Sequence, residues 1–222
     1  MYGITYYGGS HGRGTAYEIT LSGAFTTIYN FCSDSQSGTC LDGQYPYAGL
    51  VVGDSGELLV LGSDGNLYGA TQVGGANGGG TIFKVTLSGQ FTVLYNFCAA
   101  TNCLDGSNPV TPLVQATNGD FYGTTPYGGA NGSGTLFSLS LGLSPFVEIQ
   151  PSTAKTGAVV KILGQDLNGA TGVSFNGASA AFTVISNSLI NATVPEAAGS
   201  GTVQVQTPGG TLSSNVPFRV RP

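Results

Sequence analysis

Short runs of alternating apolar and polar residues, separated by Gly- and Asn-rich turns, fill the first two thirds of the chain. Such alternation between turn signals is typical of half-buried β-strands. In the clearest stretch it predicts strands at Leu67 to Thr71, Thr81 to Thr86, Phe91 to Phe97 and Leu113 to Ala116. The Gly-Gly-Ala-Asn-Gly connectors supply the positive φ angles that tight hairpins require. No segment has the period of a helix, so we expect an all-β protein.

The strand pattern recurs because the sequence is itself repeated. Units begin near Tyr2, Tyr68 and Tyr122 with Tyr-Gly-x-Thr, and each continues through a Gly-Gly pair and a Gly-Thr pair into an alternating run. Two units go on to a further run ending in Tyr-Asn-Phe-Cys, whereas the third breaks off after Leu141. Four strands in about 50 residues, repeated, predict β-propeller blades, of which typically four to eight close a ring. We therefore expect an incomplete propeller-like array over residues 1–145.

A different pattern begins at residue 146 and predicts a second domain, residues 146–222. Its short alternating runs and tight turns favour a small immunoglobulin-like β-sandwich. The predicted strands are Val159 to Leu163, Gly172 to Phe175, Phe182 to Ile185, Leu189 to Val194, Thr202 to Gln206 and Val216 to Val220.

Two resemblances to known families accompany these patterns. Leu67-Tyr68-Gly69, Gly74-Gly75-Ala76-Asn77-Gly78, Gly80-Thr81-Ile82-Phe83-Lys84 and Leu94-Tyr95-Asn96-Phe97 resemble the Gloeo-Verruco (GloVer) tandem repeat of bacterial secreted and surface proteins. Val160-Lys161-Ile162, Val173-Ser174-Phe175-Asn176-Gly177 and Ile190-Asn191-Ala192-Thr193-Val194-Pro195 resemble an IPT/TIG domain. The resemblances imply an extracellular, propeller-like array with a C-terminal immunoglobulin-like spacer or interaction module, and they imply no enzymatic activity.

Four cysteines occupy equivalent places in the first two units. Cys32 and Cys98 each end a Tyr-Asn-Phe-Cys phrase, and Cys40 and Cys103 each precede Leu-Asp-Gly. This placement favours two local structural disulfides over free thiols or a metal site, since a structural zinc site needs a four-ligand cluster. Disulfides indicate an oxidising compartment, so we expect an extracellular or cell-surface protein. No signal peptide precedes Met1, and we expect the chain to be a mature or excised part of a longer secreted precursor.

Composition narrows the possible partners. Only 8% of the residues are charged, against roughly 25% in an ordinary domain, and the net charge is −5. Because the net charge is negative and the six cations are scattered, we expect no nucleic-acid binding. Because Gly, Ser, Thr or Asn interrupts every apolar run, we expect no membrane span. An unclosed array leaves sheet edges and a sheet face open, and few charges would need desolvation there. These features favour other copies of the chain as partners.

The candidate catalytic groups are few. His11, the single histidine, aligns with Asn77 and Asn131, which favours a turn residue that tolerates left-handed geometry. The repeated carboxylates favour turn capping; Ca²⁺ binding and acid–base catalysis are the alternatives, and no other cofactor is expected. These carboxylates are Asp42 with Asp105 and Asp64 with Asp120, and the further oxygen-rich turn begins at Asp54.

Exposed tyrosines are the candidate binding surface, because Tyr offers a large contact area at low entropic cost. Packing between blades is the alternative for them. The set consists of Tyr6, Tyr7, Tyr45, Tyr47 and Tyr127. Taken together, the sequence predicts a non-enzymatic extracellular structural or adhesive protein that self-assembles into a filament or surface layer. The alternatives are a carbohydrate- or surface-binding module of a larger secreted protein and, third, a carboxylate-dependent hydrolase or lyase.

Overall fold

The computed structural model describes residues 1–47 and 60–222. The chain divides into two compact units: Met1–Gln115 with Phe121–Leu139, and Ala116–Asp120 with Ser140–Pro222. The regular structure within the described residues is β-strand, apart from one 3₁₀ turn, η1 (Thr101–Cys103). The prediction of an all-β fold is confirmed. None of the described segments is a helix long and apolar enough to cross a membrane.

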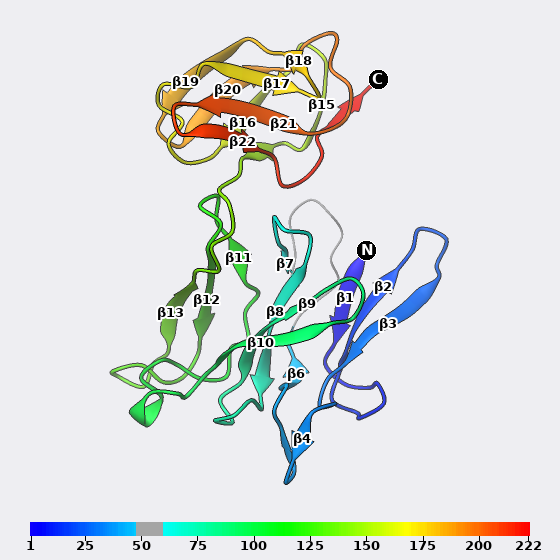
Figure 1. Ribbon diagram of the computed structural model, residues 1–222, viewed down its shortest axis with the longest axis vertical. Helices are drawn as coiled ribbons and strands as arrows, with labels where there is room; N and C mark the ends of the chain where they lie inside the picture. Colours follow the sequence, from blue (N-terminus) through cyan, green and yellow to red (C-terminus); the bar gives the residue numbers. More distant parts are fainter. Residues whose placement is uncertain (48–59) are drawn as a thin grey trace. The chain divides into compact units, whose positions relative to one another are not determined.

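The first unit contains three successive antiparallel sheets (Figure 1). Sheet 1 has the order β1-β2-β3, formed by β1 (Tyr2–Thr5), β2 (Thr15–Ile19) and β3 (Phe25–Asn30). Sheet 2 has the order β10-β9-β8-β6, with β7 also paired to β8; its strands are β6 (Gln44–Pro46), β7 (Val60–Leu61), β8 (Leu67–Val73), β9 (Thr81–Val85) and β10 (Phe91–Asn96). Sheet 3 has the order β11-β12-β13, formed by β11 (Val114–Gln115), β12 (Phe121–Thr125) and β13 (Thr135–Leu139). A small hairpin, β4 (Ser35–Gln36) with β5 (Thr39–Cys40), follows sheet 1.

The sheets are shifted by one strand from the sequence repeats. We expected the run Leu113 to Ala116 to be the fourth strand of the second repeat, but β11 pairs with β12 of the third repeat. The prediction was wrong for this strand because a tight turn joins it to β12 of the third repeat, whereas the longer segment 97–113, which contains the second disulfide, separates it from β10. The strand that opens each of sheets 2 and 3 is thus supplied by the preceding sequence repeat. The propeller-like character of this incomplete array stays a prediction.

Two side-chain devices recur in the sheets and explain the repeated Tyr-Gly-x-Thr phrase. In sheet 2, Thr71 Oγ1 lies 2.9 Å from Thr81 Oγ1 and accepts a hydrogen bond from the Thr81 N–H at 3.0 Å. Equivalent threonine pairs join the first two strands of sheet 1 and the last two of sheet 3. The glycine allows an aromatic ring to cross it: a Cβ on Gly123 would lie 2.5 Å from Cζ of Phe137 on the neighbouring strand.

The glycine-rich turns are also held by a repeated contact. Asn96 Oδ1 accepts a hydrogen bond from the Ala76 N–H at 2.8 Å, and Asn30 makes the same contact in the first repeat. His11 lies in a turn, as the sequence indicated, but the left-handed position of that turn is the next residue. That residue is Gly12, whose φ is 70°, and glycine adopts this conformation without a Cβ clash.

Successive sheets in the first unit pack face to face through aromatic and aliphatic side chains. The fully buried core between sheets 1 and 2 contains Ala16, Phe31 and Phe83. Between sheets 2 and 3, the rings of Tyr68 and Phe121 lie 4.3 Å apart. The same kind of face-to-face contact therefore joins each sheet to the next.

The second unit is a β-sandwich, as predicted (Figure 1). One sheet has the order β14-β16-β20-β19, formed by β14 (Glu148–Gln150), β16 (Val159–Leu163), β20 (Leu189–Thr193) and β19 (Phe182–Ser186). The other has the order β18-β17-β21-β22, formed by β18 (Ala178–Ser179), β17 (Gly172–Phe175), β21 (Val203–Thr207) and β22 (Gly210–Ser213). A parallel pair, β15 (Thr153–Lys155) and β23 (Arg219–Arg221), completes the domain. The core contains Ile162, Phe175 and Val205, all fully buried.

Candidate functional site

The two predicted disulfides are confirmed, and each closes a loop that follows the last strand of a sheet. Cys32 is bonded to Cys40 and Cys98 to Cys103. Each loop also contacts the next repeat. The carbonyl of Cys40 accepts a hydrogen bond from the Gly75 N–H at 2.8 Å, and that of Cys103 accepts one from the matching glycine of the third repeat at 3.0 Å. The loops are therefore connectors between successive sheets.

The carboxylate that follows each loop holds it in place. Asp105 Oδ2 accepts hydrogen bonds from the hydroxyl of Tyr95 at 2.8 Å and from the Ala99 N–H at 3.0 Å, while Oδ1 accepts one from the Ala100 N–H at 3.1 Å. Burial raises the pKa of Asp105, but these hydrogen bonds to the ionised form outweigh it and bring the pKa below its usual value. Burial and the bond to Asp105 raise the pKa of Tyr95. This carboxylate is ionised and engaged in structure.

Asp42 is the equivalent carboxylate of the first repeat, but within the described part of the chain only one of its oxygens accepts hydrogen bonds. Its Oδ2 accepts from the hydroxyl of Tyr29 at 2.7 Å and from the Ser33 N–H at 2.9 Å. Its Oδ1 is buried without a hydrogen-bond partner among the described residues. The longer first loop does not place an N–H where Ala100 stands in the second.

The second pair of repeated carboxylates also lies in turns. Asp64 accepts hydrogen bonds from the Asn66 N–H at 3.1 Å and from the hydroxyl of Tyr68 at 2.8 Å. Asp120 Oδ2 accepts one from the side-chain amide of Asn118 at 2.8 Å. Asp64 therefore caps its turn as expected, whereas in the other turn the backbone N–H of Asp120 donates a hydrogen bond to Oδ1 of Asn118 at 3.0 Å. The described residues contain no cluster of three or more potential metal-binding side chains. The oxygen-rich turn that begins at Asp54 lies outside them.

Four of the five candidate tyrosines gather at one place. The ring of Tyr6 lies 4.6 Å from that of Tyr7, 5.1 Å from that of Tyr45 and 5.9 Å from that of Tyr47. Tyr7 and Tyr47 are 68% and 48% exposed. Tyr6 donates a hydrogen bond to Oε1 of Gln72 in β8 at 2.6 Å. The cluster therefore combines packing between sheets 1 and 2 with an exposed aromatic surface.

The remaining members of this region differ in role. The guanidinium carbon of Arg13 lies 5.1 Å from the centre of the Tyr45 ring, a cation–π distance. Tyr127 is 61% exposed and belongs to the third repeat. Among the described residues it makes no ring contact with the other four. The structure thus brings together Tyr6, Tyr7, Tyr45 and Tyr47 and leaves Tyr127 apart.

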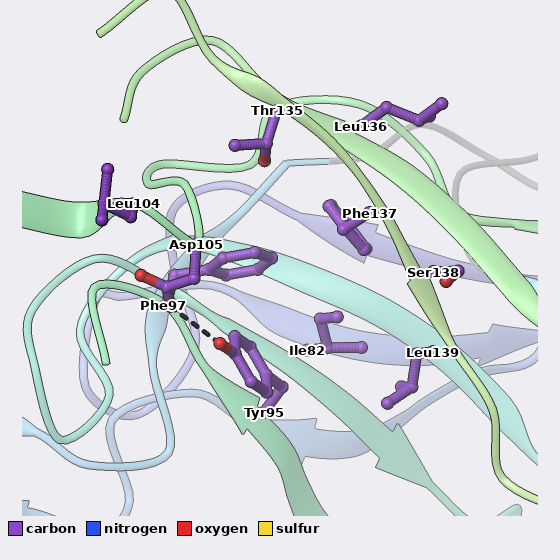
Figure 2. Close-up of a pocket in the computed structure, with 10 residues that line it drawn as sticks. All are labelled: Ile82, Tyr95, Phe97, Leu104, Asp105, Thr135, Leu136, Phe137, Ser138 and Leu139. Atoms are coloured by element: carbon purple, nitrogen blue, oxygen red, sulfur yellow. Dashed lines mark hydrogen bonds between the residues drawn. The ribbon is translucent and has the colours of Figure 1, made fainter. Parts of the chain in front are cut away.

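An open pocket of about 300 Å³ lies between sheets 2 and 3, and the sequence did not indicate it. Tyr95 and Phe97 line it from sheet 2, Phe137 and Leu139 line it from sheet 3, and Asp105 stands at its end (Figure 2). The side chain of Leu136 points away from the pocket in Figure 2. A signal for it was available in the sequence: Phe25 and Phe91 begin the last strand of units one and two, and counting from Leu141, Pro145 takes their place in the third.

Uncovered apolar side chains at both ends of the sheet series were also missed. On sheet 3, Leu136 is 76% exposed and Val114 is 60% exposed. On sheet 1, Phe25 is 58% exposed. Sequence alternation alone does not distinguish a face that meets a neighbouring sheet from one that meets none.

The fold defines a protein of tandem β-sheet repeats followed by an immunoglobulin-like sandwich. Residues 1–181 match the Gloeobacter/Verrucomicrobia repeat, and residues 146–220 match the IPT/TIG domain. The chain belongs to the Gloeobacter/Verrucomicrobia repeat family, and both resemblances noted in the sequence are confirmed. No curated protein shows significant similarity to it.

Three solved structures show distant similarity to this chain. SGBP-B from a xyloglucan utilization locus of Bacteroides uniformis shares 17% identity at a TM-score of 0.29, over 58% of this chain and 36% of its own. The γ-CGTase of alkalophilic Bacillus clarkii shares 18% identity at a TM-score of 0.30, over 70% and 24%. A fungal alcohol oxidase of the AA5 family, in complex with copper, shares 15% at a TM-score of 0.32, over 98% and 50%. The chain spans half or less of the length of each.

Proposed function

We propose that this chain is a non-enzymatic, extracellular structural or adhesive protein that self-associates head to tail through its repeat sheets. The observation that carries the proposal is the pair of uncovered faces at the two ends of the sheet series. Each matches a face that is buried between successive sheets inside the first unit.

The outer face of sheet 3 corresponds to the face by which sheet 2 contacts sheet 3. Ile82 and Ala70 on that face of sheet 2 are 2% and 5% exposed. Their equivalents in sheet 3 are Leu136, 76% exposed, and Thr124, also exposed. Sheet 3 thus presents a docking face that the first unit leaves uncovered.

The outer face of sheet 1 is complementary to it. Phe83 and Val85 of sheet 2 are fully buried against sheet 1. Their equivalents Tyr17 and Ile19 are only half-buried, and Phe25 stacks on Tyr17 at 4.9 Å while remaining exposed. Sheet 1 of one copy on sheet 3 of another would repeat the contact already made within the chain.

Such a contact is heterologous, so it builds either a closed ring or an open filament. Burying one Leu or Phe side chain contributes about 1.5–3 kcal/mol, and the low charge of the chain leaves few groups to desolvate. The two disulfides support an extracellular setting. The structural engagement of Asp105 and Asp64 supports a non-enzymatic role.

The test is the solution mass of the protein as a function of concentration, by light scattering after size exclusion, with electron microscopy of the same samples. We expect species larger than the 22.4 kDa monomer. Leu136→Asp is expected to abolish them, because it places a charge in the docking face, while Val159→Asp serves as control at a position 64% exposed in the sandwich domain. A chain that stays monomeric at all concentrations contradicts self-association.

A second candidate function is binding of a carbohydrate or other surface ligand by the tyrosine cluster. It is favoured by the joint exposure of Tyr7 and Tyr47 beside two further rings. Binding to surface polysaccharides on a glycan array should be lost in Tyr7→Ala and retained in Tyr127→Ala. An array without any hit removes this candidate.

A further inference from the structure

The contact between sheets 1 and 2 contains a group of four aromatic rings. The ring of Phe91, from the last strand of sheet 2, stacks on Tyr29 at 4.2 Å with an angle of 10° between the planes. It also stacks on Phe83 at 5.3 Å and meets Phe31 edge-on at 5.7 Å. Phe31 and Phe83 are edge-on at 5.1 Å. The last strand of sheet 2 thus places one ring in the middle of this group.

Three of these four rings recur between sheets 2 and 3 with nearly the same geometry. Phe97 and Phe137, the equivalents of Phe31 and Phe83, lie edge-on at 5.1 Å. Tyr95 and Phe97 lie edge-on at 5.2 Å, and their equivalents in the first contact lie at 5.4 Å. The fourth ring, equivalent to Phe91, has no counterpart among the described residues.

The open pocket occupies the place of this fourth ring. It is lined by Tyr95, Phe97 and Phe137, the equivalents of the three residues that Phe91 contacts in the first group (Figure 2). Its volume of about 300 Å³ leaves room for an aromatic side chain. The pocket is therefore already shaped by the rings that would enclose a phenylalanine.

Among the described residues, the backbone beside the pocket also has no strand partner. The order β11-β12-β13 leaves β13 at the edge of sheet 3, where β3 and β10 flank the equivalent strands of sheets 1 and 2. In both complete cases the added strand is antiparallel and has a register shift at the same place. In sheet 2, Phe91 stands opposite Val85 and Tyr95 opposite Ile82. The same register on β13 would place an incoming Phe opposite Leu139 and an incoming Tyr opposite Leu136.

The chain does not fill this position from its own third repeat. Pro145 stands where Phe91 would be, and proline lacks the N–H that a paired strand donates. The next residue, Phe146, is 4% exposed and belongs to the second unit. The strands with the required sequence, β3 and β10, are already paired in their own sheets.

We infer that the edge of β13 and the adjoining pocket form an acceptor site for an unpaired strand of this same repeat, Phe-Thr-x-aliphatic-Tyr-Asn-Phe, supplied by a second polypeptide segment. The backbone of the incoming strand pairs with β13, and its first Phe completes the ring group. This mode of binding is strand addition, in which main-chain hydrogen bonds give affinity and side-chain pockets give specificity. The site is distinct from the outer face of sheet 3 that the proposed self-association uses.

The test uses a fluorescently labelled peptide with the sequence of residues 88–97 and the intact protein, followed by anisotropy. A matched peptide carries Phe91→Ala. We expect saturable binding of the first peptide and at least tenfold weaker binding of the second. Hydrogen exchange should show new protection at residues 135–139.

Two protein variants define the place of binding. Leu104 lines the pocket and is 52% exposed, so Leu104→Asp should weaken binding without disturbing the fold. Leu87 is 49% exposed in the β9–β10 hairpin and does not line the pocket, so Leu87→Asp should bind as the unsubstituted protein does.

Absence of saturable binding, equal affinity for the Phe and Ala peptides, or protection away from β13 would each overturn the inference. The result separates from that of the self-association test. A monomeric chain that binds the peptide keeps the acceptor site and loses the proposed assembly. An assembling chain that ignores the peptide does the reverse.

Discussion

Replacing Asp105 by Ala removes the acceptor that holds the second disulfide loop against its sheet. Three donors lose their partner: the hydroxyl of Tyr95 at 2.8 Å and the backbone N–H groups of Ala99 and Ala100 at 3.0 and 3.1 Å. The loop also contains the carbonyl of Cys103, which accepts a hydrogen bond from the third repeat. The substitution therefore acts both within a sheet and on the connection to the next.

The magnitude follows from the number and exposure of these bonds. A hydrogen bond to a charged group contributes about 1.5–3 kcal/mol, but bonds that share one acceptor are not additive. Asp105 is only half-buried, so water replaces part of what is lost. We expect the free energy of unfolding of the first unit to fall by about 2–3 kcal/mol. With a urea slope of about 2 kcal/mol/M, the midpoint falls by about 1 M or slightly more.

Tyrosine fluorescence makes the assay specific for one unit. All 11 tyrosines lie in the first unit and the chain contains no Trp, so the signal reports only the repeat sheets. Urea unfolding at neutral pH would compare the unsubstituted chain, Asp105→Ala and Asp34→Ala. Asp34 is an exposed carboxylate in the first disulfide loop, and its replacement removes the same charge without the buried contacts.

A tyrosine-detected midpoint that Asp105→Ala shifts no more than Asp34→Ala does would contradict this expectation. In that case the loop would be held by its disulfide and backbone alone. Tyr95→Phe gives a further check, because it removes one donor and should reproduce only part of the loss.

The remaining predictions use the same unfolding assay. Gly123→Ala should destabilise the first unit by about 1–3 kcal/mol, because its Cβ would lie 2.5 Å from the neighbouring ring; Gly209→Ala, with only one contact at 3.8 Å, should be nearly neutral, and equal effects would contradict the account. The lowered pKa of Asp105 means that its stabilising contribution is complete above the ordinary carboxyl pKa and is lost as pH falls through the folded-state value, so stability should fall below a pH of about 4 and fall less steeply in Asp105→Asn. Replacing Cys98 and Cys103 together by Ser should cost about 2 kcal/mol in the first unit and leave circular dichroism of the Cys-free second unit unchanged; a null result would show that the loop is ordered without the bond.

Much of the local structure could be predicted because its causes are local. Alternation placed β9 and β16 correctly. In β16 one face is buried and the other is not, whereas β9 has buried apolar side chains on both faces, Ile82 on one and Phe83 on the other. Cys98 and Cys103 lie in the same short loop, so their bond follows from equivalent positions in two units. The tyrosine cluster was only partly foreseen: Tyr6 and Tyr45 were candidates, but their stacking at 5.1 Å depends on the contact between two sheets.

The sequence by itself determined the strands, the repeat and the disulfide pairing, because each depends on residues close together in the chain. Only the tertiary structure decided which sheet the run around Val114 joins, since several sheets offer an edge of the same pattern. It also decided that Ile82 is buried while its equivalent Leu136 is 76% exposed. The two positions have the same local sequence pattern. They differ because sheet 3 covers that face of sheet 2, whereas none of the described sheets of the repeat array covers the same face of sheet 3, and burial depends on such a neighbour.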